Sequence, residues 1–302
     1  MWKIKKTAWY IIAAGLLISI ASCTNQQTKN KSGQDNSAGN ISDSSLAGNE
    51  NKEQIFFLIP SPGEILERFH NSGIQYNPGL LNSAGNKDKY LGSKAQSLNL
   101  GVYIADLAYL ALFERSTETV SYLETIQSLG VEAGISSSIY ENLLVRAKAN
   151  AGNMDSLLSI SNEAFGNMKE FLENGGKENM IARISAGAYI ESMYIALQSM
   201  NKFSVSGPLP ELLTEMKYPT ANLVELARNV ITTENDSSLY QYINQVSLIF
   251  NEMETRSSKI LISQPQAGRI SISGGEKLRM NENEFNSLRK TVTGIREEMV
   301  GY

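Results

Sequence analysis

The stretch from Ser93 to Ile260 constrains the fold most, because apolar residues recur in it at helical spacing almost throughout. Short polar or glycine-containing connections divide this stretch. They predict helices at about residues 93–114, 117–129, 136–149, 155–173, 178–201, 220–232 and 237–260. Helices joined by short connections pack as antiparallel neighbours. The pattern therefore predicts an all-α fold, either an antiparallel helical bundle or a curved array of helical hairpins.

A short helix is predicted ahead of this stretch. Ser61 and Glu64 have the spacing of a capping box, and Pro62 suits the first turn of a helix. The apolar residues that follow lie on one face, and Asn71-Ser72-Gly73 ends the pattern.

The C-terminal end departs from the helical pattern. Two short alternating runs, RISIS and EKLRM, flank the pair Gly274-Gly275, which is typical of a small β-hairpin with its turn at the glycines. A lone hairpin is marginally stable in water, so we expect it to pack on the helices. The run NENEFNSLRKTVTGIREEM then predicts a final helix.

The N-terminus carries a targeting signal. A basic head, Met1 to Lys6, precedes an uncharged run that is shorter than the roughly 20 apolar residues of a membrane-spanning helix. This layout predicts a signal peptide over residues 1–22. Its end, Ile20-Ala21-Ser22-Cys23, resembles the lipobox of bacterial lipoproteins. The resemblance implies cleavage before Cys23, a diacylglycerol on its thiol and an acyl chain such as palmitate on its new amine. An ordinary signal peptide or an uncleaved anchor are the alternatives.

A polar segment separates this signal from the folded part. Residues 23–53 are rich in Asn, Ser, Gly and Gln, a composition that cannot bury enough apolar surface to fold, so they are predicted to form a flexible lipidated tether. Residues 54–302 are predicted to form one helical domain, since their length suffices for a single core. In some Bacteroidota, acidic residues right after the lipidated cysteine resemble a surface-export signal; none occur here before Asp35, which implies a periplasm-facing location. Thr24 after the cysteine, in place of Asp, implies the outer membrane.

Charge and cysteine usage restrict the partners. The formal net charge is −4, and loss of the leader lysines Lys3, Lys5 and Lys6 takes it to −7. Such a chain has no electrostatic basis for binding nucleic acid, so the membrane is expected to be contacted only through the N-terminal lipid. Cys23 is the only cysteine, which excludes intramolecular disulfides. The expected binding partners are therefore another envelope protein or a small-molecule ligand.

Two predicted helices carry carboxylates inside apolar stripes. Asp106 lies in a stripe near its helix centre, and Glu191 interrupts another. A carboxylate in apolar surroundings must be paired, hydrogen-bonded or protonated. The candidate polar cluster comprises Tyr103, Asp106, Arg146, Arg183, Tyr189 and Glu191. It forms either a small-ligand pocket with Arg146 or Arg183 opposite the carboxylates, or a structural ion-pair and tyrosine network that fixes helix register.

The same two helices share a sequence echo. GVYIADLAYLAL, which begins at Gly101, matches GAYIESMYIAL, which begins at Gly187, if one residue is skipped. A tetratricopeptide-like array would produce such echoes, although their spacing is not a multiple of the about 34-residue period of that family. The alternative is chance similarity between two buried helices that use glycine for close approach.

Catalytic and metal signatures are mostly excluded. His70 is the only histidine, so His-based metal cages are ruled out, and no Gly-x-Ser-x-Gly elbow accompanies it. No phosphate-binding loop is present, and neither a metal nor another cofactor is expected. A pair of carboxylates such as Asp106 and Glu191 could serve an envelope hydrolase, and the separation of the two groups decides this.

One modification pattern is present in the helical region. Asp155-Ser156-Leu157 resembles the Asp-Ser/Thr-aliphatic pattern that is used for periplasmic O-glycosylation in Bacteroidota, which implies a glycan on Ser156. The alternative is that Asp155 caps the helix that begins there.

Three phrases, FFLIPSPGEIL, YNPGLLN and SLNLGVYIADLAYLALFE, resemble a family of Bacteroidota lipoproteins that have a helical domain and no assigned activity. The resemblance spans roughly Ile55 to Met200 and implies origin and compartment only. Two functions are thus predicted. One is a non-enzymatic, membrane-anchored envelope lipoprotein that binds a partner or ligand or acts as a scaffold. The other is an envelope hydrolase using inward-facing carboxylates, which requires Asp106 and Glu191 to open into a cleft.

Overall fold

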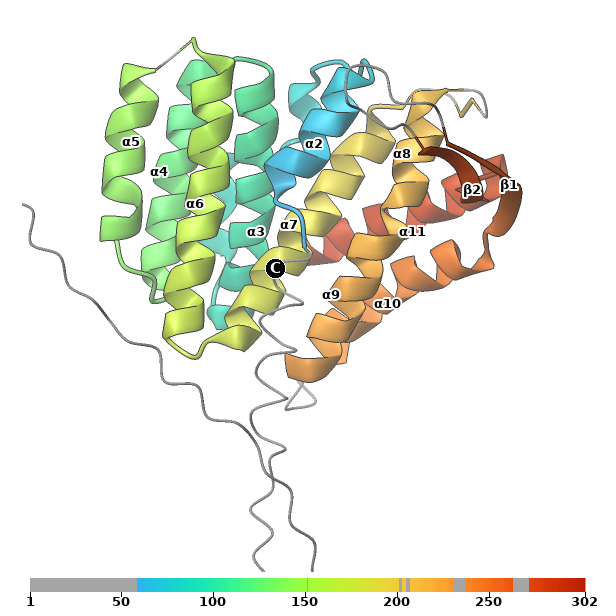
Figure 1. The fold of residues 1–302 in the computed structure, drawn as a ribbon. Coiled ribbons are helices and arrows are strands. Elements are labelled where there is room, and N and C mark those ends of the chain that lie inside the picture. Colours follow the sequence, from blue (N-terminus) through green and yellow to red (C-terminus); the bar gives the residue numbers. More distant parts are fainter. Residues whose placement is uncertain are drawn as a thin grey trace, which may run out of the picture. The chain divides into compact units, whose positions relative to one another are not determined.

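The computed structural model describes residues 59–150, 152–200, 203–204, 207–230, 237–262 and 272–301. These residues form an all-α fold with a small two-stranded antiparallel sheet near the C-terminal end, as the sequence predicts (Figure 1). The predicted signal peptide, the tether and Cys23 lie outside the described residues. The helices are α2 (Pro62–Asn71), α3 (Ser93–Leu112), α4 (Ser116–Glu132), α5 (Ser138–Ala149), α6 (Met154–Asn174), α7 (Glu178–Gln198), α8 (Pro208–Glu215), α9 (Lys217–Val230), α10 (Ser237–Glu252) and α11 (Glu282–Val300).

Helices α3 and α7 form the centre of the fold. Nearly all of their residues are buried, so both helices are covered on every side. Helix α3 packs against α4 and α6, and α5 contacts both α4 and α6. Helix α7 packs in the same way against α9 and α11, and α10 contacts both of these. Two four-helix sets therefore meet along their first helices, with α3–α6 at the left of Figure 1 and α9–α11 at the right.

The sequence echo lies where α3 and α7 cross. A Cβ atom placed on Gly101 would lie 2.0 Å from the carbonyl oxygen of Ile184, and one on Gly187 would lie 2.0 Å from that of Leu98. No side chain fits at either distance, so glycine is required on both helices for the backbones to approach this closely. The echo thus reflects a packing requirement that α3 and α7 share.

The capping box predicted for the first helix is confirmed. The Ser61 side chain accepts a hydrogen bond from the Glu64 amide, and the Glu64 carboxylate accepts one from the Ser61 amide. Asn281 and Glu284 form a second capping box at the start of α11. Between α2 and α3 the chain makes two 3₁₀ turns, η1 (Pro78–Leu80) and η2 (Ala84–Lys89), that lie against α3 and α4.

The sequence prediction is wrong in two details near the C-terminus. Helix α10 ends at Glu252, and residues predicted to continue it form strand β1 (Glu254–Ile262). Gly274 and Gly275 lie inside strand β2 (Ile272–Arg279) and not in a turn, since Gly275 pairs with Ser258. The pairing register shifts between Ser258 and Leu261, and a glycine pair tolerates the local distortion of such a bulge. Tertiary strand pairing has overridden the local helical pattern.

Helix α8 is absent from the sequence prediction. Pro208 and Pro210 lie in its first turn, where a missing N–H breaks no helical hydrogen bond. Helix α9 follows at once, with Pro219 in its own first turn. Helix α8 packs on β2 and α9, so it brings the hairpin against the second helix set.

Candidate functional site

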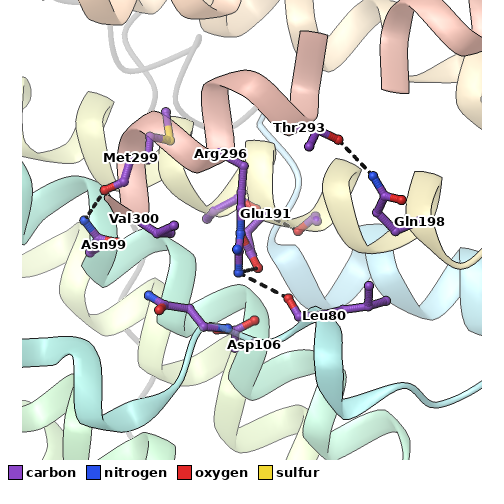
Figure 2. Close-up of polar contacts among 12 residues, drawn as sticks. Leu80, Asn99, Asp106, Glu191, Gln198, Thr293, Arg296, Met299 and Val300 are labelled. Carbon is purple, nitrogen blue, oxygen red and sulfur yellow. Dashed lines mark hydrogen bonds and ion pairs between the residues drawn. The ribbon is translucent and has the colours of Figure 1, made fainter. Parts of the chain in front are cut away.

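The two carboxylates singled out by the sequence meet in the interior, together with an arginine from α11 (Figure 2). The Arg296 guanidinium donates from Nε to Glu191 Oε2 at 3.0 Å and from Nη2 to Glu191 Oε1 at 3.1 Å. Its Nη2 also donates to the carbonyl oxygen of Leu80 at 3.2 Å. The Glu191 side chain is fully buried and that of Arg296 is 13% exposed. This is a buried, bidentate ion pair that links α7 to α11.

Asp106 completes this buried cluster from α3. Its Oδ2 accepts a hydrogen bond from the backbone N–H of Asn82 at 3.1 Å, and its side chain lies within hydrogen-bonding reach of Glu191. Burial and the charge of Glu191 hold the pKa of Asp106 well above its usual range, although Arg296 lowers it. Burial also raises the pKa of Glu191, but there Arg296 and Asp106 oppose the shift.

The position of the shared proton follows from these opposing effects. Glu191 accepts both guanidinium bonds, which favours its carboxylate form, whereas the strongly raised pKa of Asp106 favours the protonated form of that side chain. Asp106 Oδ1 accepts no hydrogen bond from a described residue, which fits an oxygen that carries a proton and donates it to Glu191. The cluster of Arg296, Glu191 and Asp106 is then neutral overall, with one positive and one negative charge. We call these three residues the core cluster.

Tyrosine hydroxyl groups extend the core cluster toward the 3₁₀ turns. Tyr103 donates to the carbonyl oxygen of Ser83 at 2.8 Å, and Tyr122 donates to that of Asn82 at 2.9 Å. Burial raises the pKa of both tyrosines, so both remain hydrogen-bond donors. The Tyr122 bond satisfies the Asn82 carbonyl oxygen, and the Tyr103 bond adds to the one that the Ser83 carbonyl oxygen accepts from the Asn86 amide. The core cluster and its tyrosines therefore join the segment of the 3₁₀ turns to α3, α4 and α11.

Other residues of the predicted cluster lie elsewhere. Arg146 pairs with Glu163 on α6 at 2.7 Å, with both side chains 40% exposed, so its predicted place opposite the carboxylates is wrong. Arg183 is half-buried on α7, and the arginine that pairs with Glu191 is Arg296 instead. Tyr189 is buried, and its hydroxyl contacts the Thr220 hydroxyl and the Met216 carbonyl oxygen, which joins α7 to α9.

The structure also corrects the capping residue of α6. Asn153 is the N-cap, and its Oδ1 accepts a hydrogen bond from the Ser156 amide at 2.8 Å. Asp155 lies inside the first turn and is not the cap. Ser156 is half-buried there, and its glycosylation stays a prediction.

Arg296 was not among the residues that the sequence singled out. It lies four residues after Val292 and three before Met299, which are both buried on α11. That spacing places Arg296 beside an apolar stripe, the same signal that drew attention to Asp106. An arginine at such a position on the last helix would have been a better candidate partner than Arg146.

The described residues show no open cleft at the core cluster. Asp106 and Glu191 are both fully buried. Within the described ranges, no group of three or more His, Cys, Asp or Glu side chains is placed to hold a metal ion. His70 packs its ring edge-on against Phe113, with the ring centroids 4.7 Å apart.

A different region is open to solvent. A groove of about 660 Å³ lies between α8, the start of α9 and the hairpin. A second hollow of about 490 Å³, beside α2, shares Glu215 and Tyr218 with it. We call the larger hollow the hairpin groove; its lining includes Glu211, Glu215, Lys217, Tyr218, Thr255, Lys277, Leu278 and Arg279. Three separate stretches of chain contribute to it, so local sequence patterns do not reveal it.

No family model matches the chain, and no curated protein or solved structure is similar enough to it to count as a match. In the described part of the chain, no helix is both long and apolar enough to cross a membrane. What the protein does must therefore be inferred from its own residues and geometry.

Proposed function

We propose that this protein is a bacterial envelope lipoprotein that binds a small ligand in the hairpin groove without transforming it. A lipid on Cys23 anchors the chain to the outer membrane, and the helical domain faces the periplasm. The lipobox-like end of the leader and the resemblance to Bacteroidota lipoproteins support the anchor and the compartment. The observation that carries the binding function is the hairpin groove, whose volume of about 660 Å³ falls in the range of small-molecule sites.

The core cluster argues against the hydrolase alternative. A glycosidase needs two carboxyl groups that flank a bound substrate and leave room for water. Asp106 and Glu191 are fully buried, and Arg296 binds both carboxylate oxygens of Glu191. Their arrangement suits a structural role, in which a neutral cluster fixes the register of α3, α7 and α11.

The anchor is tested by Cys23→Ala. We expect this variant to escape lipidation and to accumulate either as unprocessed precursor or in the soluble fraction, while wild type fractionates with membranes. Mass spectrometry of the mature N-terminus supplies the measurement. A Cys23→Ala protein that is cleaved at the same site and still fractionates with membranes would contradict the anchor.

The groove is tested with a tryptophan that fills it. Thr255 lines the hairpin groove, whereas Arg256, the next residue on β1, is not among the lining residues. Ligand-observed NMR with a library of small solutes, on full-length protein in lipid nanodiscs, should find solutes that lose binding in Thr255→Trp and keep it in Arg256→Trp. If no solute distinguishes the two variants, the groove is not a ligand site.

A further inference from the structure

The charges that line the hairpin groove are not balanced within it. Its two carboxylates are already paired: Glu211 forms an ion pair with Lys277, and Glu215 forms one with Arg68 of α2. Both of these carboxylates are therefore neutralised by the protein itself. A cationic ligand would have to displace Lys277 or Arg68 to reach them.

Two further cations line the same groove without such a partner. Neither Lys217 nor Arg279 makes an ion pair with a described residue. Glu254 stands opposite Arg279 in the β-ladder, yet no ion pair joins them among the described residues. Among the described residues, the groove thus has two positive charges without an ion-pair partner. A positively lined concavity attracts anions.

Apolar surface lies beside these cations. Tyr218 is 76% exposed, although a large aromatic residue is normally covered in part by its own fold. Leu278 and the buried Met280 continue the apolar wall on the hairpin side. An aromatic ring on one side and aliphatic side chains on the other suit a flat or extended hydrocarbon group between them.

We propose that the ligand of the hairpin groove is an amphipathic organic anion: a carboxylate or phosphate headgroup held by Lys217 and Arg279, with an apolar body against Tyr218 and Leu278. This inference rests on the proposed function, because it presumes that the groove binds a ligand. The guanidinium of Arg279 presents paired N–H donors that match the oxygens of either headgroup, and the Lys217 ammonium adds a point charge.

The experiment uses four probes that share a 4-phenylbutyl body and differ in headgroup: 4-phenylbutyrate, 4-phenylbutyl phosphate, 4-phenylbutan-1-ol and 4-phenylbutylamine. Calorimetric titration of full-length protein in zwitterionic nanodiscs, with empty nanodiscs as the blank, measures each affinity. We expect at least one anion to bind about tenfold more tightly than the alcohol, and the amine to bind more weakly than the alcohol. The carboxylate and the phosphate arms distinguish the two headgroups.

Matched variants locate the effect. Arg279→Gln and Lys217→Gln should each weaken binding of the anion by about tenfold and leave the affinity for the alcohol unchanged. Arg228→Gln is the control, because Arg228 is an exposed arginine of α9 that does not line the groove. Thermal melts of each variant verify that it is folded.

Two failures are distinguishable. If the alcohol binds as tightly as both anions, and neither glutamine variant changes an affinity, the charge inference is wrong. Loss of alcohol binding in Thr255→Trp would then still support the groove as a ligand site. If no anion binds at all, the inference is also wrong, and the proposed function falls with it when the solute library shows no difference between Thr255→Trp and Arg256→Trp.

Discussion

The core cluster and the hairpin groove both combine acidic and basic side chains, but they treat charge in opposite ways. In the core, one arginine pairs with one carboxylate, the raised pKa of Asp106 favours its neutral form, and both acidic side chains are fully buried. In the groove, Glu211 and Glu215 are paired, and Lys217 and Arg279 make no ion pair with any residue that the structure describes.

This difference suits the core cluster to a structural role and the hairpin groove to ligand binding. An unpaired charge in the protein interior costs several kcal/mol per ion. The charged groups of an interior cluster must therefore pair with one another, and no unpaired charge remains to bind a ligand. On the surface, solvent stabilises an unpaired cation at little cost, so that cation can still form an ion pair with a bound partner. Strongly shifted pKa values, which often mark functional sites, here mark the structural region.

The largest expected effect comes from removing the cation of the core cluster. Arg296→Met keeps most of the side-chain volume but leaves Glu191 buried without its partner and the Leu80 carbonyl oxygen without a donor. Breaking a buried pair in this way costs about 3–5 kcal/mol. Urea unfolding of Arg296→Met should show this loss, whereas Arg228→Met, which breaks an exposed pair, should unfold as wild type does. Equal midpoints for the two variants would contradict the structural role of the core cluster.

A smaller loss is expected at the helix crossing. Gly101→Ala forces a methyl group against the Ile184 carbonyl oxygen, and separation of α3 from α7 should cost about 1–3 kcal/mol or more. Gly166→Ala in α6 is the control, because a methyl group there would meet no atom of another element within 4 Å. That change should stabilise the protein by about 0.5–1 kcal/mol, since alanine favours helix. The two changes are chemically identical, so a shared sign in thermal melts would refute the close-packing account.

The protonation of Asp106 predicts a pH dependence of intermediate size. An asparagine there can still accept from the Asn82 amide and donate to Glu191, so Asp106→Asn should cost little at neutral pH. In wild type the raised pKa means that the native state retains a proton that the unfolded chain releases above about pH 3.8. Wild-type stability should therefore fall as pH rises from that value toward the native pKa of Asp106.

The comparison of wild type with Asp106→Asn isolates this single titration. Above about pH 3.8 the variant should gain stability relative to wild type, by up to about 1.4 kcal/mol per pH unit, until the native pKa is passed. Urea melts over a pH series measure both curves. Parallel curves would mean that Asp106 is ionised in the native protein and that the proton lies elsewhere.

How much of this the sequence predicts depends on how far the signal is local. Some predictions depend only on residues a few positions apart, and these agree with the structure. They are the helix periodicity, the Ser61–Glu64 cap and the burial of Asp106 and Glu191. The partner of Glu191 comes from more than a hundred residues away, so pairing it with Arg146 or Arg183 was a choice among arginines with no geometric guide. Arg296 does lie beside an apolar stripe on a helix that contacts α7, but Arg289 has the same spacing, so the stripe does not single out one arginine.

The hairpin region also depends on contacts between distant segments, which local sequence patterns do not predict. Residues 254–260 continue a helical pattern, yet they pair with β2 because strand partners supply hydrogen bonds that local propensity does not anticipate. The hairpin groove forms only once α8, α9 and this hairpin come together. Three separate segments line the groove, so the periodicity of any one segment does not predict it.

The smallest expected effect on stability contrasts most directly with the core. Glu211→Gln removes a carboxylate from the groove, as Glu191→Gln would remove one from the interior, with the same change of atoms. Because Glu211 and Lys277 are exposed, solvent replaces their ion pair, and the urea midpoint should not change measurably. The variant also frees Lys277 as a third unpaired cation in the groove, so binding of 4-phenylbutyrate or 4-phenylbutyl phosphate should tighten by severalfold.

Glu191→Gln should instead destabilise the protein strongly, because it leaves Arg296 buried without its carboxylate. A large stability loss in Glu211→Gln, or anion binding that weakens, would show that the groove charges serve the fold and would remove the distinction between the two regions.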